Sequence, residues 1–238
     1  MNDEKTTAYF DKEVPEYDIG RFNYTLGIIN KYASEEHTLL EIGCGTGNIL
    51  GIIQKNTPIN KVAGLDSSRE CLKKCSQRVN GEVFCGSIID SDFIGSIKSK
   101  YDFVIIGAVL HHICGKTRKE SRDYAVIAVN NALKLLNDSG YLIIIEPAFY
   151  PSLIMDILFY VKRFFSAISN ERLDLGKWNN IGAPLVSYYT NEQLLSFAPP
   201  YISLIASDIR ELGVSKVMRM FLIKRRTDTT LVFQKKAA

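Results

Sequence analysis

The sequence predicts an α/β fold, a doubly wound sheet of parallel strands with helices on both faces. Between residues 38 and 147, short apolar runs alternate with segments of helical periodicity. Such alternation is typical of parallel strands joined by crossover helices. Residues 101–106 are almost entirely apolar, as expected for a strand buried on both faces. A cluster of glycines at 43–47, directly after the first apolar run, is the third observation.

The apolar patterns define the expected elements one by one. We expect strands at residues 38–42, 61–66, 82–85, 101–106 and 141–145, and helices at 48–55, 67–79 and 124–136. Right-handed crossovers bring the loops that follow these strands to one edge of the sheet, where ligands of such folds bind. The alternation stops at Pro147.

The C-terminal part is expected to be built differently. Residues 148–168 predict a helix with only a narrow polar stripe, so we expect it to be buried by a cap, a partner subunit, an apolar substrate or a membrane surface. We expect strands at 201–209 and 230–234, and a further strand at 217–223.

Composition excludes several classes of protein. The 238 residues are 46% hydrophobic and 23% charged, which excludes collagen, low-complexity chains and intrinsic disorder. Asp156, Lys162 and Arg163 interrupt the longest apolar stretch, so no transmembrane segment is expected. The first residues lack the apolar core of an export signal, which favours a cytoplasmic protein.

Charge and cysteine content add two expectations. Residues 208–238 carry eight basic and three acidic side chains, within a net charge of +3 for the whole chain. This local excess could meet phosphates or membrane headgroups, but we favour an exposed edge strand protected by charge. The five cysteines are odd in number and never spaced CxxC, so we expect reduced, mostly buried thiols and no metal site.

The segment Glu41-Ile42-Gly43-Cys44-Gly45-Thr46-Gly47-Asn48 is the most informative one. Its alternating glycines allow close approach of a ligand to the backbone and a sharp turn into a helix. A dinucleotide fingerprint would require glycine at Asn48, and a Walker loop would require Gly-Lys-Ser/Thr. Asp66 ends the second strand, where a carboxylate can accept hydrogen bonds from both ribose hydroxyls. The two features together indicate an adenosine-type ligand.

These residues, with the strand at 101–106 and the following Val109-Leu110-His111-His112, resemble the class I S-adenosylmethionine-dependent methyltransferases that act on small molecules. The resemblance implies a single domain with a mostly parallel seven-stranded sheet, an antiparallel C-terminal strand and a helical cap insertion. It divides the chain into N-terminal lid helices (1–35), a cofactor-binding core (36–147), a cap or acceptor-site insertion (148–200) and C-terminal strands (201–238).

The resemblance also assigns contacts to S-adenosylmethionine. The motif residues Glu41, Gly43, Cys44, Gly45 and Gly47 would surround its methionine part, and Asp66 would accept from its ribose. Adenine would lie beside Ser67, Ser87 and Ile88, although the family often has Asp where Ser87 stands. The backbone of Gly107 and Ala108 would face the methionine moiety, while Tyr9, Tyr17 and Arg21 would form a lid whose basic group meets the cofactor carboxylate.

The expected function is methyl transfer to a small, apolar or aromatic acceptor, at oxygen. His111 and His112 are the candidate bases because imidazole titrates near neutrality, and Glu146 is the next candidate. We expect no nucleic acid substrate, because the Asn/Asp-Pro-Pro-Tyr/Phe sequence of amino-directed enzymes is replaced by Gly107–Leu110. Trp178, Tyr188 and Tyr189 are expected to line the acceptor pocket. Two alternatives stay open: a dinucleotide-dependent oxidoreductase, and a non-catalytic module that binds S-adenosylmethionine.

Overall fold

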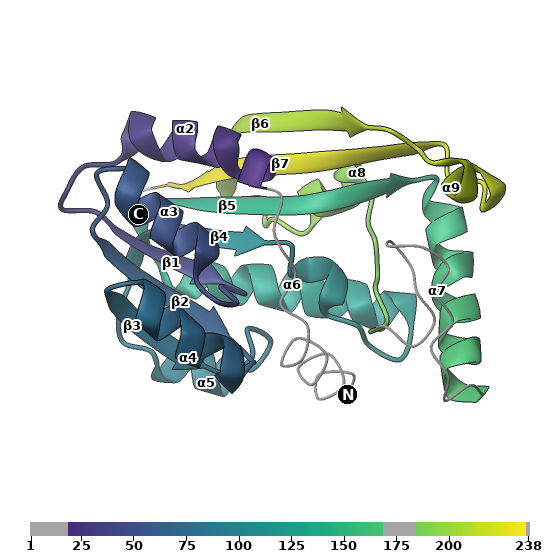
Figure 1. The fold of residues 1–238 in the computed structure, drawn as a ribbon, viewed down its shortest axis with the longest axis horizontal. Coiled ribbons are helices and arrows are strands. Elements are labelled where there is room, and N and C mark those ends of the chain that lie inside the picture. Colours follow the sequence, from purple (N-terminus) through teal and green to yellow (C-terminus); the bar gives the residue numbers. More distant parts are fainter. Residues whose placement is uncertain (1–18, 169–183, 237–238) are drawn as a thin grey trace.

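The computed structural model describes residues 19–168 and 184–236, which form a seven-stranded sheet of order β3-β2-β1-β4-β5-β7-β6 (Figure 1). The strands are β1 Thr38–Ile42, β2 Lys61–Asp66, β3 Gly81–Cys85, β4 Tyr101–Gly107, β5 Leu136–Tyr150, β6 Ile202–Leu212 and β7 Arg225–Lys235. All pairs are parallel except the two that β7 makes with β5 and β6. The predicted sheet, including its antiparallel C-terminal strand, is confirmed.

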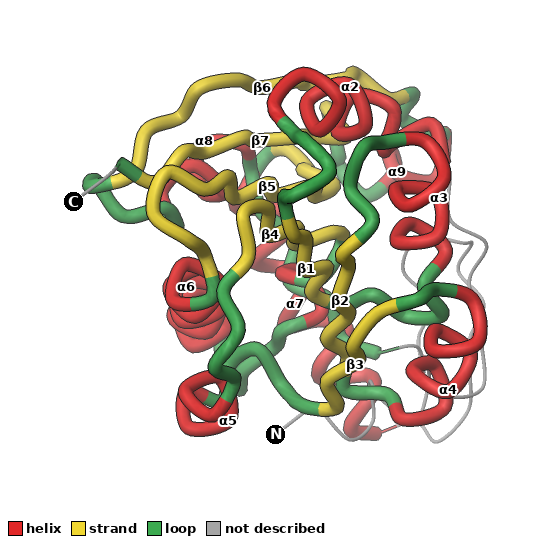
Figure 2. The backbone as a smooth tube through the Cα atoms, turned by 90° about the vertical axis from the view of Figure 1, so that its left-hand side faces the viewer, coloured by secondary structure: helices red, strands yellow, loops and turns green. Residues whose placement is uncertain are grey.

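Helices cover both faces of the sheet (Figure 2). One face is covered by α2 (Asn23–Tyr32), α3 (Asn48–Asn56) and α4 (Arg69–Arg78). The other face is covered by α5 (Ser91–Ser96) and α6 (Arg118–Lys134). Alternate residues of each central strand point to opposite faces, so the sheet separates two apolar cores. Ile143 and Ile145 of β5 enter the α2–α3 core, whereas Leu142 and Ile144 enter the α6 core. The parallel strands are therefore buried on both faces, as their sequences indicate.

Two expectations for the C-terminal strands were wrong. Residues 217–223 do not form a strand, because Ser215 Oγ accepts from the Met218 backbone N–H and caps the short helix α9 (Lys216–Met220). The basic strand β7 is not an edge strand either. It lies between β5 and β6, with its apolar centre Leu231-Val232-Phe233 buried, and β6 forms the edge.

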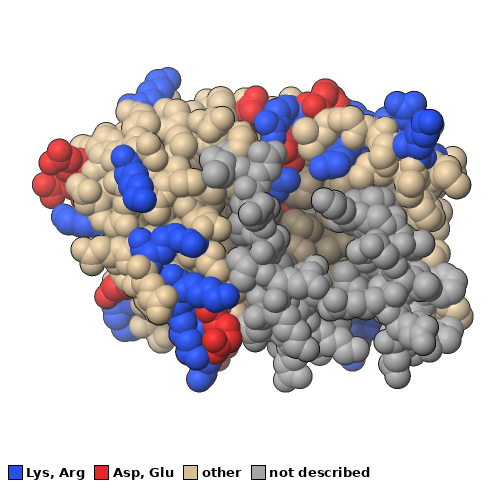
Figure 3. All heavy atoms as spheres, viewed as in Figure 1, with Lys and Arg blue, Asp and Glu red and all other residues tan. Residues whose placement is uncertain are grey.

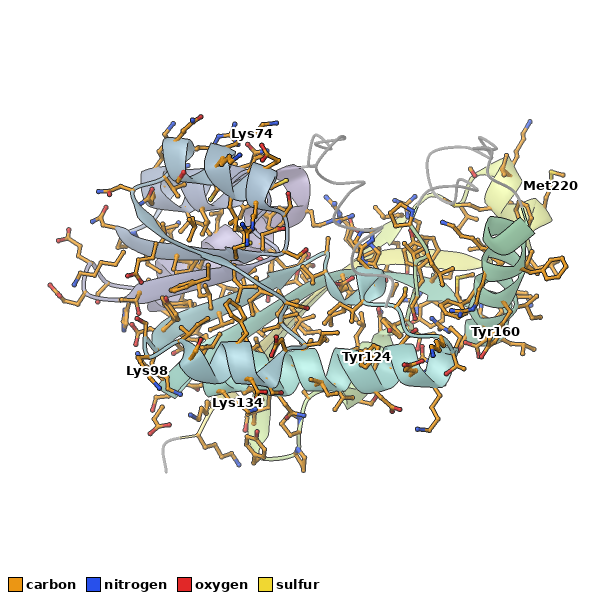
Figure 4. The ribbon with its side chains drawn as sticks, turned by 90° about the horizontal axis from the view of Figure 1, so that it is seen from below. Lys74, Lys98, Tyr124, Lys134, Tyr160 and Met220 are labelled. Atoms are coloured by element: carbon orange, nitrogen blue, oxygen red, sulfur yellow. The ribbon has the colours of Figure 1, made fainter. Side chains whose placement is uncertain are left out.

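Beyond the parallel part of the sheet, β5 continues to Tyr150 and supports a small third core with the remaining helices. Phe149 of β5, Met155 of α7 (Ser152–Ile168) and Met218 of α9 pack together there. Figure 4 shows Tyr160 of α7 and Met220 of α9 at the same end of the molecule, opposite Lys98 and Lys134. The described residues thus cover α7 on its inner side.

The outer side of α7 is exposed, so its burial by a partner subunit, an apolar substrate or a membrane surface stays a prediction. Its exposed apolar side chains include Leu153, Ile157, Val161 and Phe164. Among the described helices, none combines the length and apolar content that crossing a membrane would need.

A buried arginine ties α7 to the rest of the fold. Arg118, at the start of α6, is 3% exposed. Its Nε donates to Asp156 Oδ1 of α7 at 2.7 Å, and its other nitrogens donate to Ser187 Oγ and to the Tyr188 carbonyl. One guanidinium thus joins α6, α7 and the segment 184–190, and satisfies its donors by doing so.

We predict that Arg118→Met lowers the free energy of unfolding by about 3 kcal/mol, because it leaves buried acceptors without a donor. Urea denaturation followed by circular dichroism measures the change. Lys119→Met is the matched control on the same helix. It removes an exposed ion pair with Asp123 and is expected to leave the unfolding midpoint unchanged. Equal midpoints for the two variants would contradict the role given to Arg118.

Candidate functional site

The glycine loop turns sharply between β1 and α3. Gly43, Gly45 and Gly47 have φ values of 73°, 52° and 74°, in the left-handed region that disfavours residues with a Cβ. Packing adds a second constraint at two of them. A Cβ on Gly43 would lie 2.2 Å from Val109 Cγ2, and a Cβ on Gly47 would lie 2.7 Å from Cys75 Sγ. The three glycines therefore present only backbone at the carboxyl edge of the sheet.

The Asp66 carboxylate lies at the end of β2, beside this loop. Its Oδ2 accepts from the Gly45 N–H and its Oδ1 from the Ser68 N–H, both at 2.8 Å. These bonds hold the loop and the start of α4 in a fixed relation. A carboxylate oxygen can accept more than one hydrogen bond, so a carboxylate at this position suits the two hydroxyls of a ribose.

Glu41 is an unusual buried carboxylate in β1. It is 3% exposed, and no residue in the described part of the chain forms a hydrogen bond to its Oε2. Burial raises the pKa of Glu41 well above its usual value, and the nearby Cys75 and Asp66 raise it further. A Cβ placed on Gly107 would be 3.9 Å from Glu41 Oε1, so the carboxylate lies next to the backbone at the end of β4. This arrangement suits a ligand that brings a positively charged group.

A second buried carboxylate organises the loop after β4. Glu146 Oε1 accepts from the Leu110 N–H, and its Oε2 lies 2.6 Å from His111 Nδ1. Both residues are buried. With Nδ1–H donating to Glu146, the Nε2 atom of His111 carries the lone pair that could take a proton. The pKa of His112 is lowered well below its usual value by burial, and by the charges of His111 and Lys162, so His112 is a poor base.

Aromatic side chains continue the site beyond His111. The Tyr188 ring stacks on His111 with centroids 5.3 Å apart, and it lies 4.3 Å from the ring of Phe149. Burial raises the pKa of Tyr188 to about 12, so its hydroxyl stays protonated at neutral pH. The segment around it extends the sheet along β5, since the Phe149 N–H donates to the Tyr189 carbonyl.

Of the three residues expected to line the acceptor pocket, the structure places one near His111. Tyr188 joins the site, whereas Tyr189 points to the other face, where its hydroxyl donates to the Ser121 carbonyl in the core. Trp178 lies outside the described residues. Phe149 was not identified from the sequence, because it stands beyond the expected end of its strand, and only the length of β5 brings it next to Tyr188.

The remaining expected cofactor residues differ in what they offer. Cys44 Sγ packs against Gly64 between β1 and β2, and the Ile88 side chain is part of the α6 core, so both leave only backbone for a ligand. Ser67 and Ser87 stand in the loops after β2 and β3. Arg21 lies 2.9 Å from Asp228 Oδ1, in an ion pair. Tyr9 and Tyr17 lie outside the described residues.

Ala108 follows Gly107 in a conformation that few alanines adopt. Its φ is 56°, and its N–H donates to the Ile145 carbonyl at 2.7 Å. The turn starts the loop that carries His111. Within residues 19–168 and 184–236, no group of three or more His, Cys, Asp or Glu side chains is arranged to hold a metal ion. The five cysteines are free thiols, and only Cys85 is exposed.

Comparisons with known proteins agree with this geometry. Residues 40–142 match the family model described as "Methyltransferase domain". The chain is 26% identical over 123 residues to the ribosomal RNA small subunit methyltransferase C of Proteus mirabilis, covering 52% of this chain and 35% of that protein. It is also 26% identical over 125 residues to the carboxy-S-adenosyl-L-methionine synthase of Ruthia magnifica, covering 50% and 48%. The chain thus spans about a third to a half of the length of these curated relatives.

Solved structures share the fold over nearly the whole chain. A Methanosarcina mazei S-adenosylmethionine-dependent methyltransferase has a TM-score of 0.61 at 16% identity, covering 89% of this chain and 98% of that one. The N-methyltransferase NodS of Bradyrhizobium japonicum, solved with S-adenosyl-L-homocysteine, has a TM-score of 0.60 at 12% identity, covering 97% and 98%. At such identities the likeness concerns the fold.

The loop geometry predicts that Gly43→Ala weakens binding of S-adenosyl-L-homocysteine at least about tenfold, because the left-handed backbone costs about 1–2 kcal/mol and the new methyl group meets Val109. Isothermal titration calorimetry measures the affinity. Gly27→Ala, at an exposed helical position with open space for a Cβ, should bind as the wild type does. Unchanged affinity in Gly43→Ala would contradict the assignment of the loop.

We expect Glu41 to destabilise the folded protein and to contribute to binding of S-adenosyl-L-homocysteine. Its folded pKa is raised, so the free energy of unfolding should fall as pH rises from about 4.5 through that folded pKa. Glu41→Gln should lack this decline, unfold at a higher temperature at pH 8, and bind S-adenosyl-L-homocysteine about tenfold more weakly. Thermal denaturation across pH and calorimetry test both parts. Glu82→Gln, an exposed change on β3, is the control, and an identical pH profile in Glu41→Gln would argue against this role.

Proposed function

We propose that this chain, which belongs to the class I S-adenosylmethionine-dependent methyltransferases, transfers the methyl group of that cofactor to an oxygen atom of a small acceptor. The observation that carries the proposal is the meeting of three features at one edge of the sheet. These are the glycine loop, the ribose-competent carboxylate of Asp66, and the His111–Glu146 pair. The first two suit the cofactor and the third suits proton removal from an acceptor.

The residues at this edge fit the chemistry of S-adenosylmethionine. Its ammonium and sulfonium charges would offset the buried, unsatisfied carboxylate of Glu41. Asp66 would accept from the ribose hydroxyls, and Ser67 and Ser87 would lie beside adenine. The backbone of Gly107 and Ala108 would face the methionine part. Tyr9, Tyr17 and Arg21 remain proposed as a cover over the bound cofactor, with Arg21 meeting its carboxylate.

The cofactor supplies a methyl group bonded to a positively charged sulfur. The protein has to align the acceptor oxygen with that methyl group and keep water away, and such positioning is worth on the order of 7–11 kcal/mol. His111 Nε2 would take the hydroxyl proton as the oxygen attacks. Glu146 fixes the tautomer that leaves Nε2 free to do so, and its charge stabilises the imidazolium that results.

The aromatic surroundings of His111 favour a small aromatic or apolar acceptor. Tyr188 and Phe149 provide stacked ring faces directly beyond the imidazole. One of the relatives is an RNA methyltransferase, so the comparisons do not support the expected exclusion of nucleic acid. A nucleobase would also stack on such rings, and it is the second acceptor class to be tested.

Calorimetry with S-adenosylmethionine and S-adenosyl-L-homocysteine tests the cofactor, and release of the latter tests turnover with phenols, hydroxybenzoates and RNA. No binding at millimolar ligand would overturn the proposal. An NADH fluorescence change without binding of either ligand would favour the oxidoreductase alternative. Tight binding without turnover on any acceptor would favour the non-catalytic module.

His111→Gln is predicted to keep cofactor affinity and to reduce kcat by about 10²–10⁴-fold, because the base is lost. An unchanged cofactor affinity together with a reduced kcat is a split that a merely structural role would not produce. His37→Gln is the control, because His37 stands before β1 at the opposite edge of the sheet. Equal losses of affinity and kcat in His111→Gln would instead indicate a structural part in cofactor binding.

A further inference from the structure

The face of the sheet that carries Phe149 also carries an excess of arginine. In the antiparallel register of β5 and β7, Arg226 stands directly opposite Phe149, and Asp228 lies two residues further along the same face. The Arg226 guanidinium lies over the Phe149 ring, 5.7 Å from its centroid. Arg225 points to the other face, where it lies over the Tyr150 ring and pairs with Glu211. Strand alternation thus gives two adjacent arginines different surroundings.

The charges on this face do not balance among the described residues. Asp228 lies 2.9 Å from a nitrogen of Arg21 and 2.9 Å from a nitrogen of Arg210, so two guanidiniums share its single carboxylate. Arg226 has no ion pair or hydrogen bond with any residue in 19–168 or 184–236, and its Nε atom is buried. A half-buried guanidinium without an anion is costly unless a ligand supplies the missing charge.

Arg226, which no acidic side chain of the described residues pairs with, lies on the acceptor side of the proposed base. Phe149 contacts Tyr188, and Tyr188 stacks on His111, so a line of rings connects Arg226 to the imidazole. Arg226 is also close enough to Tyr188 to affect its ionisation. Burial raises the pKa of Tyr188, and the positive charge of Arg226 acts in the opposite direction. Figure 3 shows basic side chains, with acidic ones among them, in the upper middle of the molecule.

We infer that Arg226 binds an anionic group of the acceptor, which is therefore an aromatic or apolar molecule bearing a carboxylate or a phosphate. This inference rests on the proposed function and specifies its substrate class. The ring of such a molecule would pack on Tyr188 and Phe149, and its anionic oxygens would accept from the planar guanidinium. The other end would then reach toward His111.

Three small aromatic ligands distinguish the contribution of ligand charge to binding from that of ligand shape. Benzoate, phenyl phosphate and the neutral benzamide are each titrated by calorimetry into the full chain saturated with S-adenosyl-L-homocysteine. We expect one or both anions to bind at least about tenfold more tightly than benzamide. The anion that binds more tightly indicates whether the methyl acceptor bears a carboxylate or a phosphate. Equal binding of all three, or no binding of either anion, would overturn the inference.

Variants of the adjacent arginines provide the matched comparison. Arg226→Met should weaken binding of the preferred anion about 10- to 100-fold, Arg226→Lys should retain part of the affinity, and Arg225→Met should bind as the wild type does. Circular dichroism confirms that each variant is folded. If Arg226→Met and Arg225→Met bind the anion equally well, Arg226 is not the anion site.

The affinity for S-adenosyl-L-homocysteine, measured in the same variants, keeps the two proposals apart. It should be unchanged in Arg226→Met. A loss there would mean that Arg226 holds the carboxylate of the cofactor, which overturns the acceptor role and leaves the methyltransferase proposal intact. If the wild type does not bind S-adenosyl-L-homocysteine at all, the proposed function fails first.

Discussion

The carboxylate of Glu146 is the interaction on which the arrangement of the site depends. It accepts from the Leu110 N–H and lies beside Nδ1 of His111. Glu146 is the first residue of β5 beyond its pairing with β4. The same loop carries Val109, which closes the space beside Gly43. One buried side chain therefore fixes the imidazole and, through the loop, the wall of the glycine turn. The proposed cofactor site and the proposed acceptor site are therefore linked at this residue.

Buried polar groups gather at the carboxyl edge of the sheet, and folding alone does not explain them. Glu41 and Glu146 are both nearly inaccessible, yet only Glu146 has its two oxygens hydrogen-bonded within the described residues. An apolar residue at Glu41 would suit the core better, since desolvation opposes its charge. Sites that bind or react commonly retain such unfavourable groups at a cost in stability. The sheet and its two cores supply the stability that tolerates them.

The sequence predicted the parallel strands and the glycine loop well because local constraints dominate there. Residues 103–106 are fully buried between two helical layers, and the left-handed backbone at Gly43, Gly45 and Gly47 disfavours other residues. The C-terminal part was less predictable. A capping serine decided between helix and strand at 216–220, and the apolar pattern there fits either. The placement of Phe149 and Arg226 depends on strand pairing between distant segments, which no local pattern contains. Tyr188 could be suspected from its aromaticity, but its separation from Tyr189 required the structure.

The register of β7 has a consequence for how this protein could diverge. Because side chains alternate along a strand, a shift of β7 by one residue against β5 would exchange the surroundings of Arg225 and Arg226 and would turn Asp228 away from Arg21. The connection from β6 to β7, which includes α9, sets that register. Insertions or deletions in it would therefore be tolerated when they leave the pairing unchanged. Changes of odd length that shift the strand would alter the chemistry of the site without replacing any of its residues.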